Sequence, residues 1–261
     1  MQNLKFILST ALIALAAASV PGLSNAAPTT FFGSDLNVGG LVPPNGNALF
    51  ARNAFLTAVN NSFGESFEST SIVNGTAPTS AVPLSVFGNR ASLFNNSGTA
   101  GRIQNDPFVA GEATGRFNTT SSVAGKWWET DSSFSLTFSA ATQALGFYGT
   151  DFGDFEGALT LSFFLGLAAI ESNVRVPLVA ADSGSLLFFG YVNTQAFDRV
   201  VFNVGQFNPN NPGTFDVLGF DDFLIGTANG GPGPGPNPVP EPGTLALVAL
   251  SLGLLAARRR R

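Results

Sequence analysis

Apolar and polar residues alternate in short runs along the second half of the chain, and Gly, Asn and Pro separate the runs. In "FSLTFS", Phe134, Leu136 and Phe138 fall on one face while Ser and Thr fall on the other. A period of two is typical of a β-strand with one buried face. The runs at 159–165 and 185–192 are apolar on both faces for part of their length, which is typical of central strands between packed layers.

Other runs add strands to this set. Residues 197–204 and 216–226 complete the stronger runs, and weaker ones lie at 62–70, 91–96, 102–105 and 115–119. Roughly eight to ten strands with turns between them, and without an alternating strand–helix pattern, predict an all-β protein that folds as an antiparallel β-sandwich, like a jelly roll. No repeat or composition break divides residues 27–228, so we expect one domain there.

One segment has helical spacing instead. "NALFARNAFLTAVNN" predicts a short amphipathic helix from about residue 48 to 59, with Asn47 as its cap. The residues that recur at helical spacing, and that we expect on its buried face, are Leu49, Phe50, Asn53, Leu56 and Val59.

The first 26 residues have the form of a secretory signal peptide. Lys5 precedes the apolar run "FILSTALIALAAASV", and the small residues Ser24 and Ala26 follow it. This order predicts export through the Sec machinery and cleavage by signal peptidase near Ala26 or Ala27. The alternative is an N-terminal membrane anchor, which the short apolar run disfavours.

The carboxyl end has three parts in sequence. A Gly/Pro spacer at 229–238 separates the body from an apolar run at 245–257, and four arginines, Arg258, Arg259, Arg260 and Arg261, close the chain. The run is shorter than the ~20 residues that span a bilayer comfortably. Arginines after an apolar helix stay on the cytoplasmic side, so the body is expected outside the inner membrane, with the tail as a transient tether.

This tail resembles the PEP-CTERM sorting domain. The motif residues are Val239, Pro240, Glu241 and Pro242, and an apolar run and the arginine cluster follow them. The resemblance implies recognition and cleavage by an exosortase in a Gram-negative bacterium, and an association with exopolysaccharide and biofilm. The alternative is a plain tail-anchored protein. Segments of the body also resemble domains that often precede such tails, which implies a jelly roll and no established activity; they lie at 66–68, 146–157, 187–192 and 215–226.

Composition excludes several functions. The chain has no histidine and no cysteine, so a His-based triad, a Cys nucleophile, a disulfide and an ordinary zinc site are all excluded. Without Lys5, the four terminal arginines and Glu241, the 12 basic and 17 acidic residues fall to 7 and 16. A body this acidic, without a basic stripe, is not expected to bind nucleic acid.

The acidic residues suggest a calcium site. Calcium prefers six to eight oxygen ligands. The first and last strands commonly pair in a jelly roll, which could place Glu68 beside Asp221 or Asp222. We therefore consider a structural Ca²⁺ site drawn from Glu68, Asp151, Asp154, Asp221 and Asp222. The alternative is that these acids cap turns and stay solvated.

Two further readings concern carbohydrate. Trp127 and Trp128 in "KWWET" would point to opposite faces of a strand, so at most one belongs to the core and the other faces outward, where it is a candidate for stacking on a sugar. The alternative is an edge aromatic covered by a loop. Paired carboxylates can also serve a glycosidase, but no segment resembles a catalytic strand of such an enzyme.

These observations predict an exported, exosortase-processed surface or matrix protein with a structural or adhesive role, and no enzymatic activity. Its expected partners are the Sec machinery and signal peptidase, the exosortase, the inner membrane transiently, and exopolysaccharide. A carbohydrate-binding module is the alternative function, and a polysaccharide hydrolase is a distant third.

Overall fold

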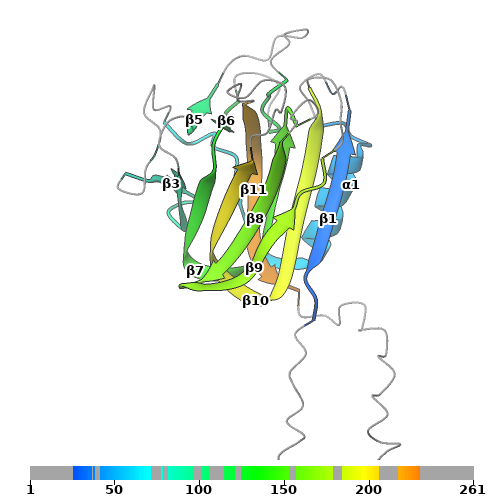
Figure 1. Cartoon of the computed structure of the whole chain (residues 1–261). Coiled ribbons are helices and arrows are strands. Elements are labelled where there is room, and N and C mark those ends of the chain that lie inside the picture. The colour runs from blue at the N-terminus through cyan, green and yellow to red at the C-terminus, as the bar shows by residue number, and fades with distance from the viewer. Residues whose placement is uncertain are drawn as a thin grey trace, which may run out of the picture.

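The structure is a computed structural model, and it describes residues 26–36, 38, 42–71, 78, 82–96, 101–105, 115–120, 125–152, 157–178, 184–205 and 217–229. Within these residues it contains one helix and eleven strands (Figure 1). In chain order they are β1 (Thr29–Asp35), α1 (Asn47–Thr57), β2 (Val59–Glu65), β3 (Leu84–Val86), β4 (Ala91–Asn95), β5 (Gly101–Gln104), β6 (Trp127–Thr130), β7 (Phe134–Thr150), β8 (Ala158–Leu165), β9 (Ala168–Arg175), β10 (Leu186–Gly205) and β11 (Leu218–Ala228).

Two long strands, β7 and β10, run through both layers of the sandwich. The first part of β7 pairs with β4, and its last part pairs with β11. The first part of β10 pairs with β1 and its last part with β8, and the register shifts between Val192 and Phe197. One layer is therefore β1–β10–β7–β11, continued by β2 and β6–β5, and the other is β3–β4–β7–β10–β8–β9. All these pairs are antiparallel, which confirms the predicted sandwich.

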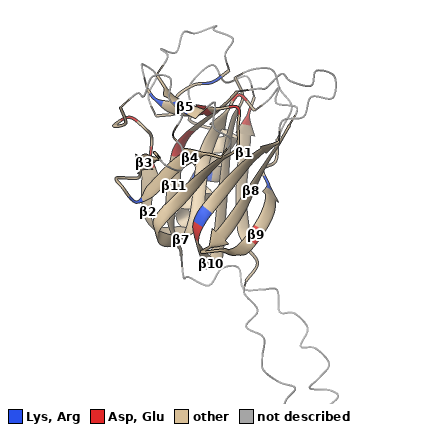
Figure 2. Cartoon of the chain, turned by 60° about the vertical axis from the view of Figure 1, so that its left-hand side comes forward, with Lys and Arg blue, Asp and Glu red and all other residues tan. Residues whose placement is uncertain are grey.

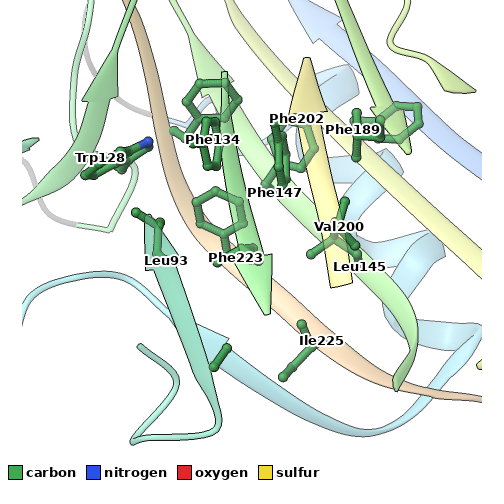
Figure 3. Close-up of a cluster of buried hydrophobic side chains, with 14 of the residues drawn as sticks. Leu93, Trp128, Phe134, Leu145, Phe147, Phe189, Val200, Phe202, Phe223 and Ile225 are labelled. Atoms are coloured by element: carbon green, nitrogen blue, oxygen red, sulfur yellow. The ribbon is translucent and has the colours of Figure 1, made fainter. Parts of the chain in front are cut away.

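Phenylalanine rings fill the space between the two layers (Figure 3). Phe134 stacks on Phe202 with ring centroids 4.3 Å apart, and Phe147 lies 5.4 Å from Phe202 and 5.7 Å from Phe223. Such pairs add a geometric preference to the burial of a large apolar area. Phe134 comes from the alternating run "FSLTFS", whose expected inward face, with Leu136 and Phe138, is confirmed.

Helix α1 covers the outer face of the β1–β10–β7–β11 layer. Its Phe55 ring enters a notch where Gly146 and Gly190 pair directly, and a Cβ on Gly190 would lie 2.5 Å from that ring. The buried helical residues are Ala48, Ala51 and Phe55. The expected face is therefore confirmed only in part: Leu56 and Val59 pack into the cluster beneath the helix, whereas Phe50 is 57% exposed and Asn53 is exposed. The fit of Phe55 against Gly146 and Gly190 therefore sets which face of α1 contacts the sheet. The most apolar stripe of the helix does not set it.

The helix begins on a carboxylate from another element. The backbone N–H groups of Asn47 and Ala48 donate to the two carboxylate oxygens of Asp35, at 2.7 and 3.0 Å. The residue at the cap position is Gly46, which has no side chain to cap with. Asn47 is therefore the first helical residue, and the prediction that it caps the helix is wrong. Unpaired N–H groups at a helix start can donate to any correctly placed acceptor, local or distant.

The predicted strands agree with the structure in most cases. The runs at 185–192 and 197–204 form one continuous strand, β10, while the segment at 115–119 is irregular. The sequence patterns did not indicate β1, β3 or β9. Among the residues that the structure describes, no helix is both long and apolar enough to cross a membrane. The signal peptide, apart from Ala26, and the sorting segment lie outside the described residues.

Candidate functional site at the acidic end of the sandwich

A β-bulge in β11 sets the position of two neighbouring acids. Asp221 pairs with Tyr148 and Leu224 with Gly146, so β11 has an extra residue between these pairs. Asp222 has φ of 46°. Because of this extra residue, Phe220 and Phe223 both lie in the central core, whereas a regular strand would place them on opposite faces. The bulge therefore keeps both rings inside and leaves the two acids between them, Asp221 and Asp222, outside the central core.

Asp221 is fully buried beneath an irregular segment of residues 117–120. One of its oxygens accepts from the N–H of Thr119 at 2.7 Å and lies 2.9 Å from Thr119 Oγ1. The other oxygen accepts from the N–H of Asp222 at 2.7 Å. Burial, and then the charge of Asp222, raise the pKa of Asp221 well above its usual value, although these hydrogen bonds act in the opposite direction.

Thr119 connects the two carboxyl groups. Its Oγ1 lies 2.9 Å from an oxygen of Asp221 and 2.9 Å from an oxygen of Asp222, while Thr120 Oγ1 donates to Asp222 at 3.0 Å. A hydroxyl has one proton and can donate to one acceptor only. With both carboxylates ionised, one of the two contacts at Thr119 would be repulsive. A proton on Asp221 satisfies both contacts, in agreement with its raised pKa.

The side chain of Glu68 contacts the same irregular segment of residues 117–120. Its carboxylate accepts from Asn118 Nδ2 at 2.7 Å and from the N–H of Lys126 at 3.0 Å. Lys126 Nζ donates to the carbonyls of Glu68 and Thr70 at 2.9 and 2.7 Å. β2, which ends three residues before Glu68, pairs with β11 as the sequence predicts. The structure thus brings Glu68, Asp221 and Asp222 to one segment, where Asp221 and Asp222 share Thr119 and Glu68 binds Asn118.

Asp151 belongs to a separate ion-pair network. Arg116 bridges Asp151 and Glu129, at 3.0 and 3.1 Å, and Arg102 contacts Glu129 at 3.0 Å. Glu129 and Asp151 are buried, so their charges are balanced by guanidinium groups within the fold. The expectation that Asp151 shares a site with Asp221 and Asp222 is therefore not supported, because Asp151 is paired with Arg116.

The predicted five-carboxylate calcium site is not assembled as such in the described part of the chain. No three acidic side chains there come close enough together to hold a metal ion. Asp154 lies outside the described residues. Calcium binding itself stays a prediction.

Both tryptophans of "KWWET" are covered. Trp128 is fully buried in the core, 5.8 Å from the Phe134 ring, and Trp127 is 4% exposed. A Cβ on Gly219 would lie 3.4 Å from the Trp127 ring and 3.6 Å from the Cβ of Arg116. The expectation that one of the two faces solvent is therefore wrong, because the segment with Arg116 lies over that face of the sheet.

Sequence reasoning missed several residues of this end. Thr119, Asn118 and Arg116 lie in a segment with no regular structure, and only the fold places them over β11. One signal was present in "FDDF": two core rings three positions apart in a strand require a bulge between them.

Comparison with known proteins adds information on the tail. Residues 238–261 match the PEP-CTERM protein-sorting motif. The motif implies export, transient anchoring in the membrane, processing by an exosortase and final placement at the cell surface or outside the cell. No curated protein matches the chain.

Solved structures with similarity to the body have low identity. The K2 cleaved adhesin domain of Lys-gingipain is 13% identical, with a TM-score of 0.38, and the match covers 63% of this chain and 97% of that one. The K1 domain from Porphyromonas gingivalis W83 is 12% identical, with a TM-score of 0.38, and covers 65% and 100%. TmCBM61 in complex with β-1,4-galactotriose is 12% identical, with a TM-score of 0.21, and covers 52% and 88%. The chain thus combines an antiparallel β-sandwich body with a PEP-CTERM protein-sorting motif.

Proposed function

We propose that this protein is a structural or adhesive component of the cell surface or extracellular matrix of a Gram-negative bacterium that produces exopolysaccharide. The Sec machinery and signal peptidase export it, and an exosortase removes its tail. The observation that carries the proposal is the sorting motif at residues 238–261, which follows a packed body after a Gly/Pro spacer. A spacer of this composition separates a folded domain from the segment that a processing enzyme must reach.

The geometry of the body supports a structural role. Its core is built from phenylalanine rings between two layers and a helix on the outer face, so a chain with no cysteine is stabilised without disulfides. Carboxylates that could attract a substrate are engaged within the fold instead: Glu65 accepts from the N–H groups of Phe67 and Phe87, and Glu129 and Asp151 pair with Arg116.

The two alternatives have less support. The two candidate sugar-stacking residues for a carbohydrate-binding module, Trp127 and Trp128, are both buried. A hydrolase needs an accessible acid and base, and Asp221, whose raised pKa suits an acid, has no exposed surface. We therefore propose no catalytic activity for the body.

The proposal is tested in a bacterium that has an exosortase. The wild-type chain, Pro240→Ala and Pro232→Ala are expressed with an epitope inserted after Ala27, and each is recovered for mass spectrometry of both ends. Pro240 lies in the sorting motif and Pro232 in the spacer, so the two variants have the same chemical change at different positions.

We expect the wild type and Pro232→Ala to lose the arginine cluster and to reach the surface fraction. Pro240→Ala should keep its tail and stay in the membrane fraction. Recovery of the wild-type chain from the cytosol with Arg258–Arg261 intact would overturn the proposal. If the Trp127→Phe variant is retained on exopolysaccharide as the wild type is, the result supports an adhesive role that does not depend on the Trp127 indole ring.

A further inference from the structure

The turn between β8 and β9 presents an apolar surface to solvent. Residues 165–169, "LGLAA", are all exposed; Leu165 is 41% exposed and Leu167 is 100% exposed. We call these five residues the apolar tip. Single exposed apolar residues are common, but two leucines on one projecting turn with no charged residue among them form a small continuous surface.

The apolar tip is held in a defined conformation. Leu165 pairs with Ala168, and Gly166 between them has φ of 58°, as the first central residue of a tight hairpin turn requires. The N–H of Gly166 lies 3.0 and 2.9 Å from the two carboxylate oxygens of Asp198 in β10. Nearby, the Arg199 guanidinium lies 3.9 Å from the centre of the Phe164 ring. The neighbouring strand therefore fixes the turn, and the exposure of Leu167 is a feature of the fold.

The apolar tip lies at the end of the sandwich where the body joins both tails. Thr29, at the start of β1, pairs with Val192, just before the register shift of β10, and Phe197, just after the shift, pairs with Thr142. Ala228, at the end of β11, donates to Gln143 at 3.2 Å. Asp198, which holds the tip, follows Phe197. In Figure 1, β1 starts and β11 ends at the lower end of the sandwich.

Charge is distributed unevenly along the same axis. Carboxylates gather toward the opposite end, as Figure 2 shows in red. Those that the register or an ion pair places there are Asp35, Glu129, Asp151, Asp221 and Asp222. Arg102 and Arg116 balance the charges of Glu129 and Asp151. The repulsion from an anionic lipid surface therefore rests on Asp35 and Asp222, and it favours presenting the apolar tip to the membrane.

The spacer keeps the body close to the bilayer. Fifteen residues lie between Asn229 and Leu245, the first residue of the apolar run, and a chain of that length spans at most ~50 Å. A tether of this reach turns a weak contact into an intramolecular one, with an effective concentration on the order of millimolar. Two leucines that would not recruit a free protein to a membrane are then sufficient to orient a tethered one.

We propose that, while the tail tethers the protein, the apolar tip contacts the lipid surface and orients the body with its acidic end away from the membrane. The inference rests on the membrane-tethered stage of the proposed function. The lipid surface is the partner of the apolar tip, because the chain leaves the body at this end toward a membrane-associated segment.

The test uses the full chain reconstituted in vesicles of phosphatidylethanolamine and phosphatidylglycerol, with and without brominated lipid chains. Leu167→Trp places a reporter on the apolar tip. Leu36→Trp is the matched control, because Leu36 is 48% exposed and follows Asp35, which pairs with Leu186 at the opposite end. The native Trp127 and Trp128 are buried and give a constant background. Equal melting temperatures for wild type and both variants show that all three fold alike.

We expect the Leu167→Trp emission to shift to shorter wavelength in vesicles and to lose intensity with brominated lipid, while Leu36→Trp does neither. If the chain floats with vesicles but Leu167→Trp is not quenched, the tail tethers the protein as proposed, and the proposed contact between the apolar tip and lipid is wrong. If the chain does not float, the tether fails and the inference fails with it. A shift that depends on protein concentration and ignores bromine indicates a second copy at the tip, and overturns the lipid assignment.

Discussion

Thr119 lies directly over Asp221, donating its backbone N–H to the carboxyl group at 2.7 Å and placing its hydroxyl oxygen 2.9 Å from the same carboxyl oxygen. The residues are 102 positions apart, and the contact joins an irregular segment to the bulge of the last strand. The hydroxyl also contacts Asp222, so two neighbouring acids share one hydroxyl in this small site.

The stability of the body should depend on pH through Asp221. Its pKa is raised in the folded state, so its favourable contribution is complete below the unfolded pKa of about 3.9 and is lost as pH rises through the folded pKa. Each unit of difference between the folded and unfolded pKa corresponds to about 1.4 kcal/mol. Asp222→Asn removes the neighbouring charge that contributes to this shift.

We therefore expect Asp222→Asn to raise the free energy of unfolding, relative to wild type, more at pH 7 than at pH 4. Urea denaturation of both proteins across this range measures the difference. The Thr119 and Thr120 hydroxyls contact separate oxygens of Asp222. An Asn side chain has one carbonyl oxygen and can accept from only one of them. That loss does not depend on pH, so the change of the difference between pH 4 and pH 7 is the readout. A difference that stays constant with pH would contradict the assignment.

Calcium would relieve the same repulsion in another way. Because no three acidic side chains of the described residues come close enough together to hold a metal ion, the calcium hypothesis now rests on the neighbouring acids Asp221 and Asp222. It predicts that free Ca²⁺ raises the melting temperature in EDTA-treated protein at pH 7. An ion that binds only the folded state at 100 times its dissociation constant stabilises it by about 2.7 kcal/mol. The rise should shrink in Asp222→Asn and persist in Asp131→Asn. An unchanged melting temperature on addition of Ca²⁺ removes the hypothesis.

The cap of α1 comes from Asp35, and this gives a direct comparison. Asp35→Ala should lower the free energy of unfolding by about 0.5 to 2 kcal/mol, because two helical N–H groups lose their acceptor. Asn47→Ala, at the position where the sequence suggested a cap, should cost less, since Asn47 makes only an exposed side-chain contact to the Ser34 carbonyl at 3.2 Å. Chemical denaturation of the two variants measures both values. A larger loss for Asn47→Ala would contradict the tertiary cap.

The tryptophans provide a test of burial. Native Trp127 and Trp128 should show blue emission that acrylamide quenches poorly, and the quenching should rise strongly on unfolding. Trp128→Ala removes a ring packed against Phe134 and should destabilise the fold by about 3 to 5 kcal/mol. Trp128→Phe, which keeps an aromatic ring there, should cost less. Efficient acrylamide quenching in the native state would contradict the burial of the pair.

Local pattern predicted the strands well where burial is one-sided. "FSLTFS" and the apolar runs of β8 and β10 were recognisable because alternate side chains of a strand point to opposite faces. The same pattern failed for β9, whose residues are largely exposed, and in part for the face of α1. The candidate acids were identifiable as types, but their partners Thr119 and Arg116 come from an irregular segment without a periodic signal.

The sequence by itself determined the class of fold, the position of the helix, the exclusion of His and Cys chemistry and the sorting motif, because composition, periodicity and a contiguous motif are local properties. Only the tertiary structure decided that Phe55 fits against Gly146 and Gly190, that Asp35 caps a helix twelve residues away, and that both tryptophans are covered. Each of these depends on which surfaces meet, and two segments distant in the chain acquire a common face only when β7 and β10 fold the sheet into two layers.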